Sequence, residues 1–317
     1  MPSPTLLILN PKAGRGAARF GRVQRVVGDA LGEIEVARTR APRDASRIAR
    51  EAVRAGVTRV VVGGGDGTLS EVVTGLLDAG LGGYAEIGIL PLGSGCDFAR
   101  SVGVPPGIED AIALMRDGSR ARVDAARIQY RGRDGNPRTS YFLNEASFGL
   151  AGLTVALVNS MGKRFGPRAA FALGSVGAIL RGCEPDVSIR VDERTVFEGR
   201  ISMVVAANGR HFGSGMRIAP DALVDDGALD LVIVERLSRL RLLARFPSLY
   251  RGTHLRYPEV HHHRGLRIEA RLRGSDYAPL DVDGEAVGTL SASIEVLPKA
   301  IGLFGLPARG AALTASA

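Results

Sequence analysis

The chain has 317 residues, of which 45% are hydrophobic and 23% are charged, and its mean hydropathy is +0.09. This composition is typical of a globular protein with enough chain for two domains. No apolar run reaches the roughly 18 residues of a membrane-spanning helix. The two cysteines, Cys96 and Cys183, are too few for a disulfide framework, so we expect a cytoplasmic protein.

The formal net charge of +8 indicates an anionic partner, which could be a nucleotide, a nucleic acid or an anionic membrane face. The chain contains no Trp, only 5% aromatic residues and no nucleic-acid-binding motif, which argues against nucleic acid. The positive charge is weak support for a membrane surface.

The first 125 residues alternate between strand and helix patterns. Short aliphatic runs predict strands, and the stretches between them place apolar residues on one helical face. Such alternation predicts a parallel sheet with helices on both faces, which binds ligands at the carboxyl ends of its strands. In chain order, the predicted strands are 6–9, 34–37, 57–62 and 87–90, and the predicted helices are 17–31, 44–55, one from Thr68, and 109–115.

The most informative loop is the run GGGDGTLSEV, residues 63–72, which follows the third predicted strand. Thr68 and Glu71 have the spacing of a capping box, which predicts a helix from Thr68. Glycine-loop amides at a helix N-terminus bind phosphate. Asp66 would repel a phosphate unless a cation or water lies between them, or unless it orients a loop amide or a substrate hydroxyl. This pattern indicates phosphoryl transfer, and the alternative is a glycine turn with a capping aspartate.

Two further loops follow predicted strands in this half. Residues 10–16, NPKAGRG, place the cation of Lys12 and two glycines before a helix, but lack the spacing of a P-loop. A phosphate contact and an ordinary turn explain this loop equally well. Residues 91–100, PLGSGCDFAR, form a second small-residue loop with an acid, which the sheet could bring beside Asp66 to complete a nucleotide pocket.

Beyond Val123, short strand patterns dominate and predict a β-rich second domain. The sequence Asp134-Gly135-Asn136 predicts a hairpin turn. The predicted strands are 126–130, 139–143, 187–191, 201–206, 229–234, 266–270 and 293–297, and the predicted helices are 150–161, 168–180 and 238–250.

Two acidic turns lie in this second half, at residues 224–228 and 280–285. Each could be an ordinary Asp-Gly turn, and together they offer enough carboxylates to bind Mg²⁺ and position a base. His261, His262 and His263 are consecutive, and neighbours on a strand face opposite sides, so we do not expect them to bind one metal ion.

Five motifs occur in a fixed order along the chain, namely NPKAGRG, GGGDGT, PLGSGCDFAR, DDG and DGE. This order closely resembles the diacylglycerol kinase catalytic family of bacterial lipid kinases, which also includes sphingosine and ceramide kinases. GGDGT alone is shared with NAD kinases, whereas the full ordered set is specific. The resemblance covers nearly the whole chain. It implies a nucleotide-binding α/β domain over 1–125, a β-sandwich-like lipid-substrate domain over 126–306, and a cleft between them. The final segment returns to the first domain in relatives, and we expect 307–317 to be a disordered tail.

The resemblance also implies roles for individual residues. Glu285 corresponds to the acceptor of the lipid hydroxyl proton, with Asp283 beside it, and Asp66 belongs to the catalytic loop. The residues implied to hold Mg²⁺ are Leu223, Asp226 and Ala228, through main-chain oxygens and water at the two apolar positions. The residues implied to line the ATP site are Asn10, Pro11, Lys12, Ala13, Gly14, Thr39, Gly65, Asp66, Gly67, Thr68, Leu69, Ser70, Glu71 and Ser94.

The chain departs from the family pattern at three positions. Ser94 stands where Thr is usual and keeps the hydroxyl. Cys96 replaces the usual Asn and loses an amide that can pair, and Ala13 replaces a common Ser while keeping its main-chain groups. None of the principal acids is missing, which favours an active kinase.

The leading hypothesis is an ATP- and Mg²⁺-dependent lipid kinase that works peripherally on anionic phospholipid at the inner membrane face. Its partners would be the lipid substrate and the membrane, without nucleic acid, and a homodimer is compatible with the sequence. One alternative is a soluble-substrate kinase of the NAD kinase type. Another is a nucleotide-gated membrane-binding regulator without turnover.

The segment 238–257 combines five arginines with leucine and phenylalanine. A basic, partly apolar helix of this kind can lie in the headgroup region of an anionic bilayer. The alternative is a solvated arginine-rich face over a helix packed on the core.

Overall fold

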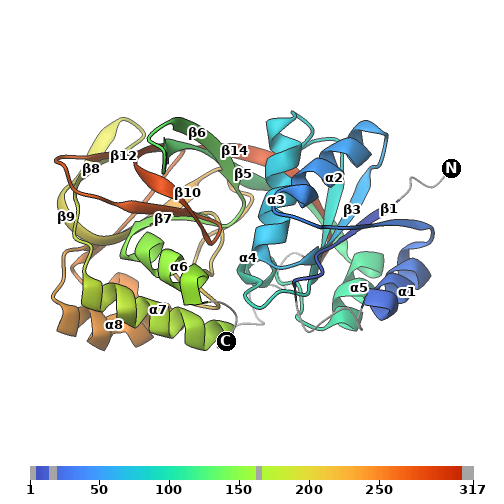
Figure 1. The fold of residues 1–317 in the computed structure, drawn as a ribbon, viewed down its shortest axis with the longest axis horizontal. Helices are drawn as coiled ribbons and strands as arrows, with labels where there is room; N and C mark the ends of the chain where they lie inside the picture. The colour runs from blue at the N-terminus through green and yellow to red at the C-terminus, as the bar shows by residue number, and fades with distance from the viewer. Residues whose placement is uncertain (1–4, 14–19, 162–165, 309–317) are drawn as a thin grey trace. The chain divides into compact units, whose positions relative to one another are not determined.

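The computed structural model describes residues 5–13, 20–161 and 166–308 (Figure 1). The chain forms two compact units. The first combines the residues up to Asp124 with those from Lys299 onward, and the second is Ala125–Pro298. Within the described ranges, no helix has both the length and the apolar character needed to cross a lipid bilayer.

The first unit is a parallel sheet with helices on both faces, as the sequence predicts. Its elements are β1 Thr5–Leu9, α1 Phe20–Leu31, β2 Ile34–Arg38, α2 Asp44–Arg54, β3 Arg59–Gly64, α3 Asp66–Asp78, β4 Glu86–Pro91, α4 Asp97–Ser101 and α5 Ile108–Asp117. The strand order is β2-β1-β3-β4, and all pairs are parallel. Helices α2 and α3 lie on one face of the sheet and α1 and α5 on the other (Figure 1). The last part of β14 (Glu285–Leu306) extends the sheet beside β4, where Gly302 pairs with Glu86.

The helix after the glycine loop begins two residues earlier than predicted. Helix α3 starts at Asp66, with Gly65 as its N-cap and no side-chain capping hydrogen bond. Thr68 therefore lies inside the helix, and the predicted capping box is wrong. The Glu71 carboxylate instead accepts a hydrogen bond from the amide of Ala45 in α2 at 3.2 Å.

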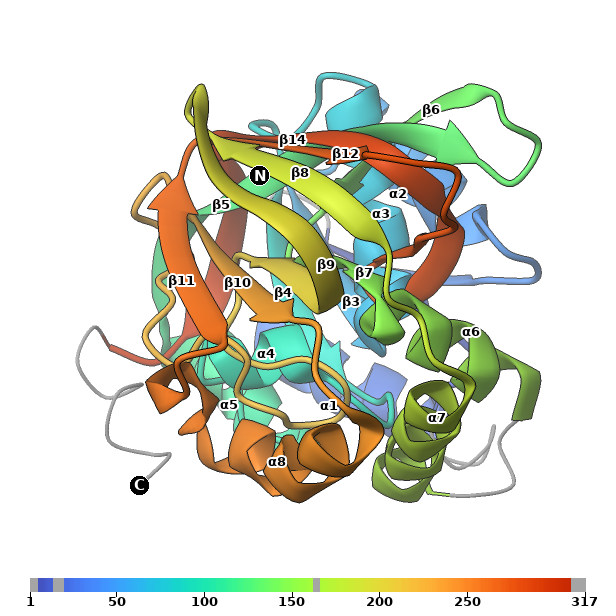
Figure 2. The same cartoon turned by 90° about the vertical axis from the view of Figure 1, so that its left-hand side faces the viewer.

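The second unit is a closed arrangement of antiparallel strands with helices on one side (Figure 2). Its elements are the part of β5 (Ser119–Gly132) from Ala125 onward, β6 Pro137–Phe142, β7 Glu145–Gly149, α6 Leu150–Met161, α7 Pro167–Arg181, β8 Asp186–Val191, β9 Arg194–Ala207, β10 Leu229–Glu235, α8 Arg239–Arg251, a 3-10 helix His254–Arg256, β11 Val260–Gly265, β12 Arg267–Leu272, β13 Pro279–Val282 and the first part of β14. The pairings run from β9 through β7, β13, β14, β12 and β8 back to β9. This circuit encloses a core of buried aliphatic and phenylalanine side chains, including Phe142 and Phe148.

The predicted elements of the second half are found, and three strands come in addition. The Asp134-Gly135-Asn136 turn joins β5 to β6, as predicted. Strands β7, β11 and β13 were not predicted, because they are short and contain acidic, histidine or glycine residues among their apolar ones.

Candidate functional site

In the first unit, Asp66 joins two glycine loops. Its Oδ2 accepts a hydrogen bond from the amide of Asp97, and its Oδ1 accepts one from the amide of Phe98, both at 3.1 Å. These amides open α4, so Asp66 caps a helix that belongs to the following loop. Of the roles that the sequence left open for Asp66, the structure shows the orientation of loop amides.

The two glycine loops approach so closely that side chains would not fit between them. The amides of Leu92 and Gly93 both donate to the carbonyl of Gly64 at 2.9 Å. A Cβ on Gly93 would lie 2.3 Å from the Cα of Gly65, well inside van der Waals contact. Close backbone approach is therefore one reason for glycine at these positions.

Asn10 ties the first loop to the same edge of the sheet. Its Nδ2 donates to Thr68 Oγ1 at 2.9 Å, and its Oδ1 accepts from the amide of Lys12 at 2.9 Å. The amide of Thr39 donates to the carbonyl of Leu9 at 3.0 Å, which places the end of β2 beside β1. The structure thus gathers the loops after β1, β2, β3 and β4 at the carboxyl edge of one sheet.

The residues implied to line an ATP site differ in exposure. Pro11, Lys12 and Ser94 are exposed, whereas Thr68 and Leu69 are buried. Gly14 lies outside the described residues. The partly buried members of the set are Asn10, Ala13, Thr39, Gly65, Asp66, Gly67, Ser70 and Glu71.

Cys96 lies in the second glycine loop in the left-handed conformation, with φ of 53°. Burial, followed by the negative charge of Asp66, raises the pKa of its thiol to about 12. A thiol with such a pKa stays protonated and is a poor nucleophile. We therefore assign Cys96 no role as a nucleophile.

In the second unit, Asp283 and Glu285 differ sharply. Asp283 is buried, and its carboxylate accepts hydrogen bonds from the amides of Leu143 (3.2 Å), Asn144 (3.0 Å) and Glu145 (3.0 Å). Glu285 is exposed at the start of β14. Since the Asp283 carboxylate is committed to three amides, Glu285 is the better placed of the two to accept a proton from a substrate.

The residues implied to hold Mg²⁺ do not fit a cation in this arrangement. One oxygen of Asp226 accepts the amide of Ala228 at 3.1 Å, and the other is ion-paired with Arg264. A guanidinium beside the only carboxylate of the three residues opposes a divalent cation electrostatically. In the part of the chain that the structure describes, no group of three or more His, Cys, Asp or Glu residues converges to hold a metal ion. The magnesium site stays a prediction of the resemblance.

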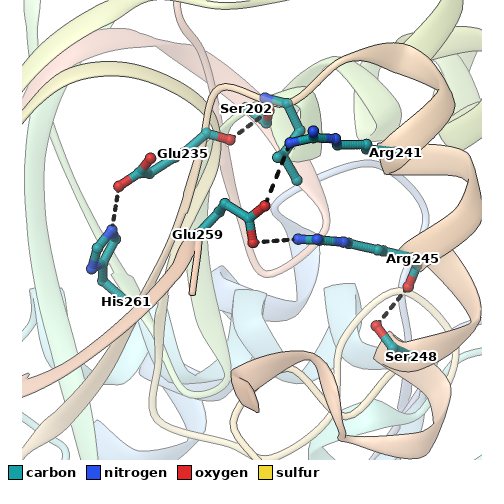
Figure 3. A network of polar contacts seen from close by, with 8 residues as sticks. Ser202, Glu235, Arg241, Arg245, Ser248, Glu259 and His261 are labelled. Atoms are coloured by element: carbon teal, nitrogen blue, oxygen red, sulfur yellow. Dashed lines mark hydrogen bonds and ion pairs between the residues drawn. The ribbon is translucent and has the colours of Figure 1, made fainter. Parts of the chain in front are cut away.

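The three consecutive histidines lie on β11. His261 pairs with Glu235 at 2.6 Å, and His262 pairs with Asp230 at 2.6 Å, so they contact different carboxylates (Figure 3 shows the first pair). The same view shows Glu259 between Arg241 and Arg245 of α8, at 3.7 and 2.5 Å. Two arginines of the proposed docking segment are therefore engaged within the protein.

The sequence did not reveal a buried pair of acids, Glu145 on β7 and Asp281 on β13. Asp281 lies two residues before Asp283, and this period-2 spacing within a strand was the available signal. Glu145 belongs to no recognisable motif, and its place is set by the pairing of β7 with β13.

Known proteins share these motifs over nearly the whole chain. The family model described as "Diacylglycerol kinase catalytic domain" matches residues 4–128, and the one described as "YegS C-terminal NAD kinase beta sandwich-like domain" matches residues 144–305. A "Probable lipid kinase YegS-like" protein of Shewanella frigidimarina is 30% identical over 266 residues, which are 83% of this chain and 81% of that protein. A protein of the same description from Enterobacter sp. is 33% identical over 236 residues, with 72% and 73% covered.

Solved structures share the fold. The crystal structure of a diacylglycerol kinase from Bacillus anthracis has a TM-score of 0.70 at 22% identity and covers 95% of this chain and 96% of its own. An NAD kinase of Archaeoglobus fulgidus has a TM-score of 0.50 at 14% identity, with 95% and 93% covered. The chain belongs to the family of lipid kinases in which a diacylglycerol kinase catalytic domain is joined to a YegS C-terminal, NAD kinase-like β-sandwich domain.

Proposed function

We propose that this protein transfers the γ-phosphate of ATP to the hydroxyl of a diacylglycerol-like lipid. The observation that carries this proposal is the double hydrogen bond of Asp66 to the amides of Asp97 and Phe98. It fixes the second glycine loop against the N-terminus of α3, where loop amides and the helix dipole favour phosphate.

Phosphoryl transfer depends on positioning and on charge neutralisation more than on covalent chemistry by the protein. We assign ATP binding to the loops after β1, β3 and β4, with the exposed Lys12 as a cation for the phosphates. We assign proton acceptance to Glu285, because Asp283 is occupied by main-chain amides. ATP enters such reactions as its Mg²⁺ complex, and no step is assigned to a metal ion held by Asp226.

We further propose that the side of the second unit formed by α7 and α8 docks on anionic bilayers. Leu240 on α8 is 80% exposed and follows the exposed Arg239, and Leu173 and Leu180 are exposed on the neighbouring α7. Exposed leucines beside arginine suit the headgroup region, where each cation contributes roughly 1 kcal/mol. Arg241 and Arg245 are paired with Glu259 and are not needed for this contact.

Docking can be tested with two exposed leucines of the same unit. Leu240→Glu should weaken sedimentation with anionic liposomes by roughly tenfold, because it places a negative charge at the bilayer contact. Leu266→Glu, between β11 and β12, is the matched control and should bind as the unmodified protein does. Equal binding of both variants at low salt would refute docking through α8, while activity on a short-chain lipid should be spared in both.

The activity itself is tested with radiolabelled ATP and a panel of acceptors in mixed micelles. The panel contains diacylglycerol, monoacylglycerol, sphingosine, phosphatidylglycerol and NAD. Label in diacylglycerol, lost in Glu285→Gln, is the expected result. Label in NAD alone would identify a soluble-substrate kinase instead. Nucleotide binding without ADP release in the presence of lipid would indicate a regulator without turnover.

A further inference from the structure

Four polar side chains share one face of the β7–β13 ladder in the second unit. Ser147 lies opposite Asp281 in the register, and Glu145 lies beside Asp283, at the end of the ladder. The alternate residues of both strands, Ala146, Phe148, Leu280 and Val282, point into the apolar core. Three of the four polar residues are acids, and all three are buried: Glu145 is 4%, Asp281 1% and Asp283 7% exposed.

The three acids differ in how many hydrogen-bond donors reach their carboxylate oxygens. The Asp283 carboxylate accepts three main-chain amides. Oδ2 of Asp281 accepts the hydroxyl of Ser147 at 2.7 Å. Oδ1 of Asp281 and Oε2 of Glu145 are buried without a donor among the described residues. An ionised carboxylate left in this state is very costly, so the pair must carry a proton or a cation.

Among the described residues, the helix and the strand that pack beside the pair bring no positive charge to it. Helix α6 packs on β7 and β13 and has no ionisable side chain, and neither has the part of β9 that pairs with β7. Two further acids, Asp283 and Glu285, act on the pair and add negative charge. Since no metal-binding group of three side chains is found in the described ranges, a proton is the remaining solution.

We propose that Glu145 is a neutral carboxylic acid that donates its proton to Asp281, and that this shared proton positions the turn carrying Glu285. The second part rests on the proposed function, in which Glu285 accepts the substrate proton. Glu145 is thus a positioning residue and contacts no substrate. Its main chain holds Asp283 from both sides, because its amide donates to Asp283 Oδ1 at 3.0 Å and its carbonyl accepts the Asp283 amide at 2.9 Å.

The titration of the pair agrees with this geometry. Burial, followed by the charge of Asp281, raises the pKa of Glu145 well above its ordinary value. Burial also raises the pKa of Asp281 from 3.8 to about 6. At neutral pH the pair therefore keeps one proton. Because both folded-state pKa values are raised, the pair contributes fully to the stability of the folded protein at pH values below the ordinary carboxyl pKa values. It is lost as pH rises through about 6 and on to the pKa of Glu145.

Loss of the shared proton would place two like charges between β7 and β13, directly before the Asp283-Gly284-Glu285 turn. We expect kcat of the unmodified protein to fall by about tenfold per pH unit above the pKa of the pair, with little change in KM for ATP. Glu145→Gln keeps a donor to Asp281 without a titrating proton, so its kcat should stay level over the same range. Glu193→Gln removes one exposed acid from the β8–β9 turn and is the matched control, with the pH profile unchanged.

The structural part is tested without any assay of turnover. The infrared C=O stretch of a protonated carboxylic acid should be present in the folded protein at neutral pH, vanish at alkaline pH, and be missing from Glu145→Gln. The unfolding midpoint of Glu145→Gln should also fall less steeply with rising pH. Absence of the band from the unmodified protein overturns the shared proton, whether or not the variant folds. If the band is present but kcat of Glu145→Gln falls like that of the unmodified protein, the positioning role is wrong. Failure of the lipid kinase assay alone would refute only the proposed function.

Discussion

Each unit contains an Asp-Gly dipeptide whose aspartate accepts main-chain amides: Asp66-Gly67 begins α3, and Asp283-Gly284 forms the turn before β14. The two dipeptides differ in how many acceptor positions of the carboxylate these hydrogen bonds occupy. Asp66 is half-buried and accepts two amides, one on each oxygen. Asp283 is buried, has φ of 47°, and accepts three. A carboxylate has about four acceptor positions, so Asp66 keeps capacity toward solvent that Asp283 lacks. The same dipeptide is thus available for chemistry in the first unit and mainly architectural in the second.

The largest expected effect is on stability and comes from Asp283→Ala. The substitution leaves three main-chain amides around residues 143–145 without their acceptor, and charge-assisted bonds of this kind are the strong ones. We expect the free energy of unfolding of the second unit to fall by about 3–5 kcal/mol, measured by urea denaturation. Asp134→Ala, in the exposed hairpin turn of the same unit, is the control and should lower stability much less, because solvent screens its contacts. If the two substitutions lower the free energy of unfolding equally, burial does not distinguish the Asp283 turn from the Asp134 turn.

Glu285→Gln should show the opposite behaviour, with turnover lost and the fold kept. Glu285 is exposed, so an isosteric amide costs little stability, whereas loss of a general base lowers the chemical step by about 10²–10⁴-fold. Single-turnover rate and ATP affinity, measured on the same samples, separate the two roles. A variant that loses ATP affinity but keeps its single-turnover rate would make Glu285 a binding residue.

Asp66→Asn should lower both stability and turnover, because Asp66 caps α4 and lies in the proposed phosphate loop. An amide offers one acceptor oxygen, so one of the two bonds to α4 is lost, at about 1 kcal/mol. Turnover should fall by roughly 10²-fold or more, as for a group that orients the charge-stabilising amides. Asp78→Asn, exposed at the other end of α3, is the control. Retention of more than about a tenth of the activity would remove Asp66 from the mechanism.

The sequence predicted the sheet and its loops well, because β1, β3 and β4 are rich in aliphatic residues, and β3 and β4 end at glycine and proline. It did not predict what the motif carboxylates touch. Asp66 caps α4 31 residues further along, and Asp283 caps a turn about 140 residues earlier. Such partners are set by tertiary structure and leave no local pattern. Glu145 was missed for the same reason, since its neighbour Asp281 belongs to a strand 134 or more residues away.

Another Asp-Gly turn of the second unit, at Asp226, gives the smallest expected effect and decides whether the comparison extends to a metal site. The Asp226 carboxylate pairs with the half-exposed Arg264 and accepts the amide of Ala228. Ion pairs at such positions contribute about 0–1 kcal/mol, so Asp226→Ala should lower stability by no more than that. The Mg²⁺ concentration for half-maximal activity should stay unchanged, because Arg264 already neutralises the carboxylate. A variant that needs several-fold more Mg²⁺, with Arg264→Ala shifting the requirement the other way, would show that the cation displaces the guanidinium. It would then place the implied magnesium site at Leu223, Asp226 and Ala228.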